Sequence, residues 1–275
     1  MLRWIRSDFP ARHRLPKPFR DHCRRTVILL IALLSGLSFD ACGGAPNALE
    51  SQSPGNGECV VLLHGLARTR HSMEKLADAL QTAGYHPVNL DYPSRKKTIE
   101  RLAVEVIPKG IERCEAVGAR RMHFVTHSMG GIVLRYYLAG HKIARLGRVV
   151  MISPPNHGSE AADALRKNVL YRWFMGPAAL ELGTDSDSLP EKLGPANYPL
   201  GIIAGSDYSF FDAWFASLIP GEDDGKVSVE STKLEGMADF LVVPGTHTFI
   251  MTDDDVIAQS IHFLRHGTFR RSSDH

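Results

Sequence analysis

The sequence has few features of metal, phosphate or nucleic-acid chemistry. Its 275 residues include only four cysteines, none in a CxxC pair, so no zinc or thioredoxin-type site is indicated. It has no glycine-rich phosphate loop, and its formal net charge of +2 is too small to favour nucleic acid. We therefore expect a protein with no cofactor, no metal and no nucleic-acid partner.

The chain also lacks an apolar run that would span a bilayer comfortably. Residues 27–37 have the length of a signal-peptide h-region and follow a basic segment, residues 1–25, with eight Lys or Arg and two Asp. Cys42, with Ala41 before it, resembles a bacterial lipoprotein cleavage site. We expect residues 1–41 to be a signal peptide. The open alternatives are lipidation of Cys42 with an N-terminal membrane tether, ordinary cleavage nearby, and an uncleaved anchor. Each makes the protein exported and bacterial: periplasmic, envelope-anchored or secreted.

A flexible tether is expected over residues 42–57, which are rich in Gly, Pro, Ser and Asn and hold too few apolar groups to pack. One domain is expected over residues 58–267, followed by a polar tail at 268–275. Cys59 and Cys114 lie in that domain. In an oxidising compartment such an isolated pair often forms a disulfide, and the alternative is two separate buried thiols.

Short apolar runs alternate with helical patterns throughout the expected domain. Six runs predict strands: 59–63, 86–91, 121–126, 147–153, 200–205 and 239–244. Helical periodicity covers 72–84, 98–118, 129–140 and 254–265, and Pro108 predicts a kink or break in the second helix. Because the runs are apolar on both faces, we expect an α/β fold with a mostly parallel sheet of about six strands and helices on both faces.

The insertion at about 155–198 differs from the other connections. Residues 160–183 read as helical, and Tyr171, Trp173, Phe174 and Met175 cluster within them. Such an excursion is either a lid or cap over a substrate site or an ordinary crossover helix packed on the sheet. The length of the insertion favours the cap.

The stretch Thr126-His127-Ser128-Met129-Gly130-Gly131 joins a predicted strand to a predicted helix. A serine at such a turn has its hydroxyl lifted clear of the backbone, and the two glycines let the helix approach the strand closely. The N–H of Met129, at the helix N-terminus, can donate to a developing oxyanion. The alternative is an ordinary strand–helix turn built from small residues.

This stretch resembles the serine motif of the α/β-hydrolase superfamily, and of bacterial lipases and esterases in particular. Thr126 stands where the family pattern G-x-S-x-G has its first glycine. The resemblance extends over most of residues 59–265 through separated motifs in the same order. It implies the α/β-hydrolase fold with a helical cap insertion, Ser128 as nucleophile and no cofactor. It also implies a second oxyanion N–H at Leu66, after His64-Gly65.

The same resemblance implies the other members of a catalytic triad. His247, in the loop after the last predicted strand, is the expected base. The unit Asp224-Gly225-Lys226-Val227 resembles the acid loop of bacterial lipases, so Asp224 is the expected acid. Asp207, directly at a strand end, is the alternative acid; Asp212 is a further candidate, and Asp223 is expected to be a solvated charge. His157 lies in a stretch like the loop that lines the lipase site, and is either substrate-lining or a structural turn residue.

The resemblance implies an exported serine hydrolase that cleaves carboxylic esters through an acyl-enzyme, with an acyl ester or lipid as substrate. Fold and triad do not separate this reading from an acyltransferase, thioesterase or amidase with the same residues. A catalytically silent, hydrolase-like binding protein is the alternative from another class.

Overall fold

The computed structural model describes residues 57–210, 216–217 and 219–271. The expected signal peptide, Cys42 and the tether up to residue 56 lie outside the described residues, as do Asp212 and the last four residues of the tail. Within the described part of the chain, no helix is long and apolar enough to cross a membrane.

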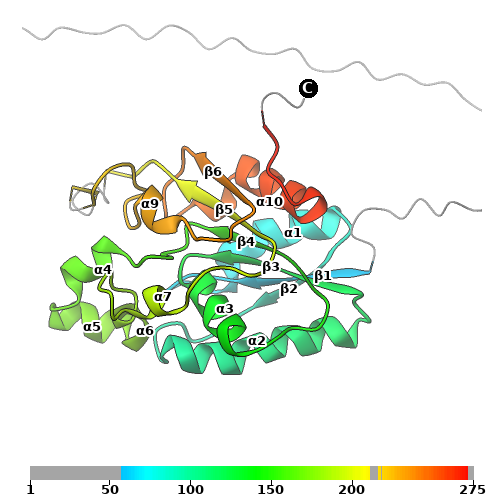
Figure 1. Ribbon diagram of the computed structural model, residues 1–275, viewed down its shortest axis with the longest axis horizontal. Helices are drawn as coiled ribbons and strands as arrows, with labels where there is room; N and C mark the ends of the chain where they lie inside the picture. The colour runs from blue at the N-terminus through cyan, green and yellow to red at the C-terminus, as the bar shows by residue number, and fades with distance from the viewer. Residues whose placement is uncertain (1–56, 211–215, 218, 272–275) are drawn as a thin grey trace, which may run out of the picture. The chain divides into compact units, whose positions relative to one another are not determined.

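Six strands of the described chain form one sheet: β1 (Glu58–Leu63), β2 (His86–Leu90), β3 (Arg121–His127), β4 (Leu146–Ile152), β5 (Leu200–Gly205) and β6 (Asp239–Val243). Their order is β2-β1-β3-β4-β5-β6, and each neighbouring pair is parallel (Figure 1). The predicted α/β fold with a six-stranded parallel sheet is therefore confirmed. Parallel strands end at the same edge, so the loops that follow them gather there.

Helices cover both faces of the sheet, as predicted (Figure 1). Val61 and Leu63 of β1 share a core with α2 (Ile99–Ala116) and α3 (Met129–Gly140). Val60 and Leu62 point the other way and share a core with α1 (Glu74–Thr82) and α10 (Asp254–His266). Side chains alternate along a strand, and both sets in β1 are buried because helices cover both faces of the sheet. This explains the unbroken apolar sequence of β1.

Helix α2 runs without interruption through Pro108, so of the kink or break that was expected there, the break does not occur. Pro108 lies on the exposed side of the helix, where water can satisfy the carbonyl that loses its partner. The opposite side packs closely on the sheet: a Cβ at Gly110 would lie 2.8 Å from Cγ1 of Val61. Burial of that apolar side holds α2 together across the proline.

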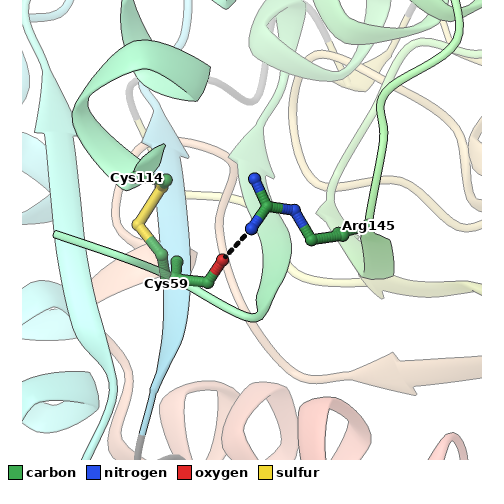
Figure 2. Close-up of a disulfide and its surroundings, with 4 residues drawn as sticks. Cys59, Cys114 and Arg145 are labelled. Carbon is green, nitrogen blue, oxygen red and sulfur yellow. Dashed lines mark hydrogen bonds between the residues drawn. A yellow bond between two sulfur atoms is a disulfide. The ribbon is translucent and has the colours of Figure 1, made fainter. Parts of the chain in front are cut away.

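A disulfide joins Cys59 of β1 to Cys114 of α2. Figure 2 shows it with Arg145 beside it, whose guanidinium donates to the carbonyl of Ala119 at 2.9 Å. The cross-link spans 55 residues of sequence and includes β2 within its loop. It therefore ties a central strand to the helix that covers it.

The insertion folds into short helices rather than one crossover helix. They are α4 (Glu160–Leu165), α5 (Val169–Met175), α6 (Pro177–Leu180) and α7 (Leu189–Lys192). Ser159 caps α4 and Asn168 caps α5 through their side-chain oxygens. Two further one-turn helices, α9 (Val229–Thr232) and η2 (Ile250–Thr252), lie in the loops around β6, and η1 (Arg70–Met73) precedes α1.

Candidate active site

Ser128 occupies the turn between β3 and α3, with φ 53° and ψ −126°. Non-glycine residues rarely adopt such a backbone, so the surrounding structure must hold it. The Ser128 N–H donates to the carbonyl of Ile152 at 2.9 Å, and its own carbonyl accepts from the N–H of Gly131. A Cβ at Gly130 would lie 2.7 Å from the carbonyl oxygen of Leu63, so α3 comes this close to β1 only because residue 130 has no side chain.

The structure brings Ser128, His247 and Asp224 together in one hydrogen-bonded chain. His247 Nε2 lies 2.8 Å from Ser128 Oγ, and His247 Nδ1 lies 2.8 Å from Asp224 Oδ2. All three residues are buried. The second carboxylate oxygen of Asp224 accepts from the backbone N–H groups of Lys226 and Val227 at 3.1 and 3.0 Å. The geometry is that of a nucleophile, a base and a group that orients the base.

The backbone of His247 is held from both sides. Its N–H donates to the carbonyl of Asp224 at 2.9 Å, and its carbonyl accepts from Nε2 of His127 at 3.0 Å. Burial, and then the nearby His247, hold the pKa of His127 well below its usual value. A neutral ring with its proton on Nε2 fits this contact, because a carbonyl can only accept. The sequence interpretation did not foresee this bond, since it joins residues 120 positions apart.

The loop after β1 lies against Ser128. A Cβ at Gly65 would stand 3.1 Å from Cβ of Ser128. The loop continues through Leu66 to Ala67, whose φ is 56° and whose N–H donates to Oγ of Ser94 at 3.1 Å. Among the described residues, the N–H groups of Leu66 and Met129 donate to no other protein group. Both predicted oxyanion donors thus flank the serine.

His64 anchors that loop from below. Its ring is buried and stacks on Tyr92 with centroids 4.0 Å apart. Its Nε2 accepts from the Tyr92 N–H at 3.3 Å, and the Tyr92 hydroxyl donates to the His64 carbonyl. Burial lowers the pKa of His64, which keeps the ring neutral in this stack. His64 is thus a structural residue.

A cavity of about 450 Å³ opens above Ser128 and His247. Its volume falls within the range of ordinary small-molecule sites. One wall is the loop after β1, with Leu66, Ala67 and Arg68, and another is formed by residues of the insertion. Arg68, Lys226 and Thr248 are among its polar residues. Its apolar lining from the insertion comprises Pro155, Ala161, Ala162, Leu165, Tyr171, Phe174, Met175 and Leu182.

The alternative acid Asp207 and the neighbouring Asp223 lie outside this hydrogen-bonded chain. Asp207 is exposed, and its carboxylate accepts from the N–H of Tyr208. Asp223 is buried rather than solvated, so that expectation is wrong: its carboxylate turns inward and accepts from the Gly225 N–H at 2.7 Å. Burial raises the pKa of Asp223.

His157 does not line the cavity. It lies half-exposed on the insertion, with Nδ1 2.8 Å from a carboxylate oxygen of Glu191. In the described ranges, no group of three His, Cys, Asp or Glu side chains is arranged to hold a metal ion.

Comparisons with solved structures show the same fold in several enzymes. The chain is similar to the mature lipase BlEst2 of Bacillus licheniformis, with 18% identity and a TM-score of 0.63, covering 81% of this chain and 96% of that one. It is also similar to phospholipase PlaB of Legionella pneumophila, with 19% identity and a TM-score of 0.59, covering 76% of this chain and 57% of that one. A metagenomic carboxyl esterase, MGS0156, matches with 19% identity and a TM-score of 0.55, covering 70% of this chain and 66% of that one.

At these identities the structural matches establish the fold alone. No curated protein sequence matches the chain significantly. The sequence of residues 60–271, however, matches the family model described as the alpha/beta hydrolase family. That range contains the turn of Ser128, the loop of Leu66 and the loops of Asp224 and His247. The chain therefore belongs to the alpha/beta hydrolase family.

Proposed function

We propose that this protein is a serine hydrolase that cleaves carboxylic esters, in the manner of lipases and esterases. The observation that carries the proposal is the unbroken hydrogen-bonded chain from Ser128 through His247 to Asp224 on the floor of an apolar cavity. Each residue comes from a connection at the same edge of the sheet. The backbone of Ser128 is bonded to the end of β4, and the backbones of Asp224 and His247 are bonded to each other.

The first half-reaction begins when Ser128 Oγ attacks the ester carbonyl carbon. His247 Nε2 takes the hydroxyl proton, and the carbonyl π electrons move to its oxygen. The N–H groups of Leu66 and Met129 would hold that oxyanion, an interaction that contributes about 10²–10³ in rate for each donor. Asp224 accepts from Nδ1–H and stabilises the imidazolium. The C–O bond then breaks, His247 gives its proton to the leaving alcohol, and an ester of Ser128 remains.

The second half-reaction returns the enzyme to its starting state. Water takes the place of the alcohol and gives a proton to His247 as its oxygen attacks the acyl carbon. Collapse of the second tetrahedral intermediate breaks the bond to Ser128 Oγ, which regains its proton from His247, and the carboxylic acid leaves.

The cavity lining supports an apolar acyl group. Leu165, Tyr171, Phe174 and Met175 line the same cavity as Ser128. Burying each methylene of a chain against such a wall contributes about 0.8 kcal/mol. The names of the similar structures, which include a lipase, a phospholipase and a carboxyl esterase, agree with an ester or lipid substrate.

The proposal is tested by hydrolysis of p-nitrophenyl esters from acetyl to palmitoyl. Ser128→Ala and His247→Ala should each reduce kcat/KM by at least ~10³-fold, and Asp224→Asn by a similar order. Asp207→Asn and His157→Ala are matched controls, because both side chains lie outside the cavity. A fluorophosphonate should label the wild type and not Ser128→Ala.

Other outcomes decide between the alternatives. Inert wild type that also resists the fluorophosphonate would mean that Ser128 is a turn residue and that the chain is a binding protein. Preferential transfer of the acyl group to an added alcohol would indicate an acyltransferase, and faster turnover of thioesters or anilides would indicate a thioesterase or amidase.

Export and tethering form a separate proposal that rests on residues 1–42. Cell fractionation of the full chain should place it in the envelope or outside the cell. Incorporation of labelled palmitate that is lost in Cys42→Ser would support lipidation, and an intact N-terminus in the isolated protein would contradict cleavage.

A further inference from the structure

Helix α5 (Val169–Met175) buries none of its seven residues, although all of them except Arg172 are apolar or aromatic. Val169, Leu170 and Trp173 are 74%, 75% and 83% exposed. A surface helix of a globular domain usually turns its apolar stripe to the core and its polar side to water. In α5 the apolar side chains extend around the helix, so one part of them faces outward.

The helix has a cavity side and an outer side. Tyr171 and Met175 line the cavity above Ser128. At 3.6 residues per turn, Val169, Leu170 and Trp173 fall within an arc of about 100° that points elsewhere. The same short helix thus carries the wall of the candidate active site and an apolar outer surface. In Figure 1, α5 lies with α4 and α6 at one end of the described domain.

Cations surround the outer side of α5. Between Asp163 and Glu181 the chain holds three basic residues and no acidic one. Arg166 is paired with Asp185. Lys167 and Arg172 are exposed, and in the part of the chain that the structure describes neither has a carboxylate within ion-pair distance.

A third cation reaches α5 from the loop after β2. The guanidinium of Arg95 lies 4.7 Å from the ring centroid of Phe174 and donates to the Phe174 carbonyl at 3.2 Å. Among the described residues it too has no carboxylate partner. Three exposed cations therefore border one exposed apolar helix side.

We propose that α5 docks on an anionic lipid bilayer, with Val169, Leu170 and Trp173 among the acyl chains and Lys167, Arg172 and Arg95 at the headgroups. An apolar helix side with Trp and flanking basic residues fits the membrane interface. A second copy of this chain would bring the same three cations against their equivalents, so charge disfavours self-association through this surface. This docking rests on the proposed function, because it would place the wall of the cavity next to a lipid substrate.

The experiment follows Trp173 in the full chain. Trp4→Phe and Trp214→Phe leave Trp173 as the single tryptophan. Its emission is measured with vesicles of phosphatidylcholine, alone or mixed with phosphatidylglycerol, whose acyl chains carry bromine as a quencher. We expect a blue shift and quenching in the mixed vesicles and little change in the neutral ones. Because quenching acts only within the acyl layer, an N-terminal anchor alone does not produce this signal.

Charge variants test the basic border. Each cation at an anionic surface contributes about fivefold in partitioning, so Lys167→Gln with Arg172→Gln should raise the lipid concentration needed by roughly 25-fold. Lys109→Gln with Lys142→Gln is the matched control, since both side chains are exposed on other elements. Val169→Ser with Leu170→Ser should weaken quenching at unchanged charge.

Three results would overturn the docking: no quenching in anionic vesicles, equal quenching in neutral ones, or an equal loss in the control pair. Self-association without lipid that is lost in Val169→Ser with Leu170→Ser would assign the surface to a second copy instead. Hydrolysis of a soluble acetyl ester is measured on the wild type in parallel. Hydrolysis without insertion removes only the docking, and insertion without hydrolysis removes only the proposed activity.

Discussion

Arg135 of α3 provides the most direct test of how the insertion is held on the domain. Its side chain is buried, with 4% exposed. Nη1 donates to the carbonyl and the side-chain oxygen of Asn156 at 2.9 and 3.1 Å, and Nη2 donates to the carbonyls of Pro190 and Gly194 at 3.1 and 2.9 Å. No carboxylate of the described chain lies within ion-pair distance of it. One guanidinium therefore links α3 to both ends of the insertion.

Substitution of Arg135 by Met keeps most of the volume and removes every donor. Each buried acceptor left unsatisfied costs about 1–3 kcal/mol, but a small cavity beside the guanidinium can admit water to some of them. Removing the buried charge also relieves the desolvation that lowers the pKa of Arg135. We expect a net loss of about 3 kcal/mol, which corresponds to one to three buried acceptors left unsatisfied.

Urea and thermal unfolding measure this loss. For a domain of this size, 3 kcal/mol corresponds to a fall in Tm of about 6–12 °C. Lys142→Met, at an exposed position just past the same helix, is the control. Arg135→Lys should be intermediate, because an ammonium cannot reproduce the planar fork. A loss below about 1 kcal/mol in Arg135→Met would refute the reasoning, since a surface substitution costs as much.

Three further predictions concern the site and the buried histidines. His127→Leu should lower kcat for ester hydrolysis about tenfold, one buried hydrogen bond, while His127→Gln keeps a donor and recovers most of it; equal loss in both would contradict positioning of the base. Gly130→Ala should reduce hydrolysis more than tenfold, because relieving a 2.7 Å contact between the new Cβ and a backbone oxygen costs about 1.4 kcal/mol or more and displaces the serine turn. Gly140→Ala, which has open space around it, should leave hydrolysis unchanged. Slower fluorophosphonate labelling of Gly130→Ala than of Gly140→Ala would support this prediction, and equal labelling of the two variants would contradict it. Burial lowers the pKa of His64 and His123 in the folded state, so below about pH 6.5 the unfolded chain binds more protons than the folded chain. The urea concentration at the unfolding midpoint should therefore decrease as the pH is lowered from about 7.5 to about 5.5. A midpoint that stays constant or increases would contradict this.

The four inner strands of the sheet could be predicted from the sequence because almost all of their residues are buried, whereas β2 and β6, at the edges, were found from shorter apolar runs. Continuous apolar runs bounded by Gly, Pro or polar residues mark where a strand begins and ends. All six predicted ranges coincide with strands to within one or two residues. The helical period was equally clear in α1 and α10. The spatial order of the strands was not predicted, because it depends on contacts between segments far apart in the sequence.

The candidate site shows the same division. Ser128 and the loop of His247 stand in local patterns, a strand–turn–helix and a strand end, that resemble known motifs. The backbone bond from His127 to His247 and the inward turn of Asp223 have no local signature, because each depends on loops that meet only in the fold. The insertion was expected as one helical excursion, yet Gly176 at φ 79° and Pro177 divide it. A Cβ at Gly176 would overlap the Arg95 carbonyl, so that break is required by packing.

The backbone of Ser128 has a consequence for the balance between stability and reactivity. A side chain at φ 53° and ψ −126° is held against its own conformational preference, at a cost of about 1–3 kcal/mol. Glycine at this position would relieve that strain while removing the hydroxyl. Ser128→Gly should therefore have a larger free energy of unfolding than the wild type and no hydrolytic activity. Selection for stability alone would replace the serine and keep the turn.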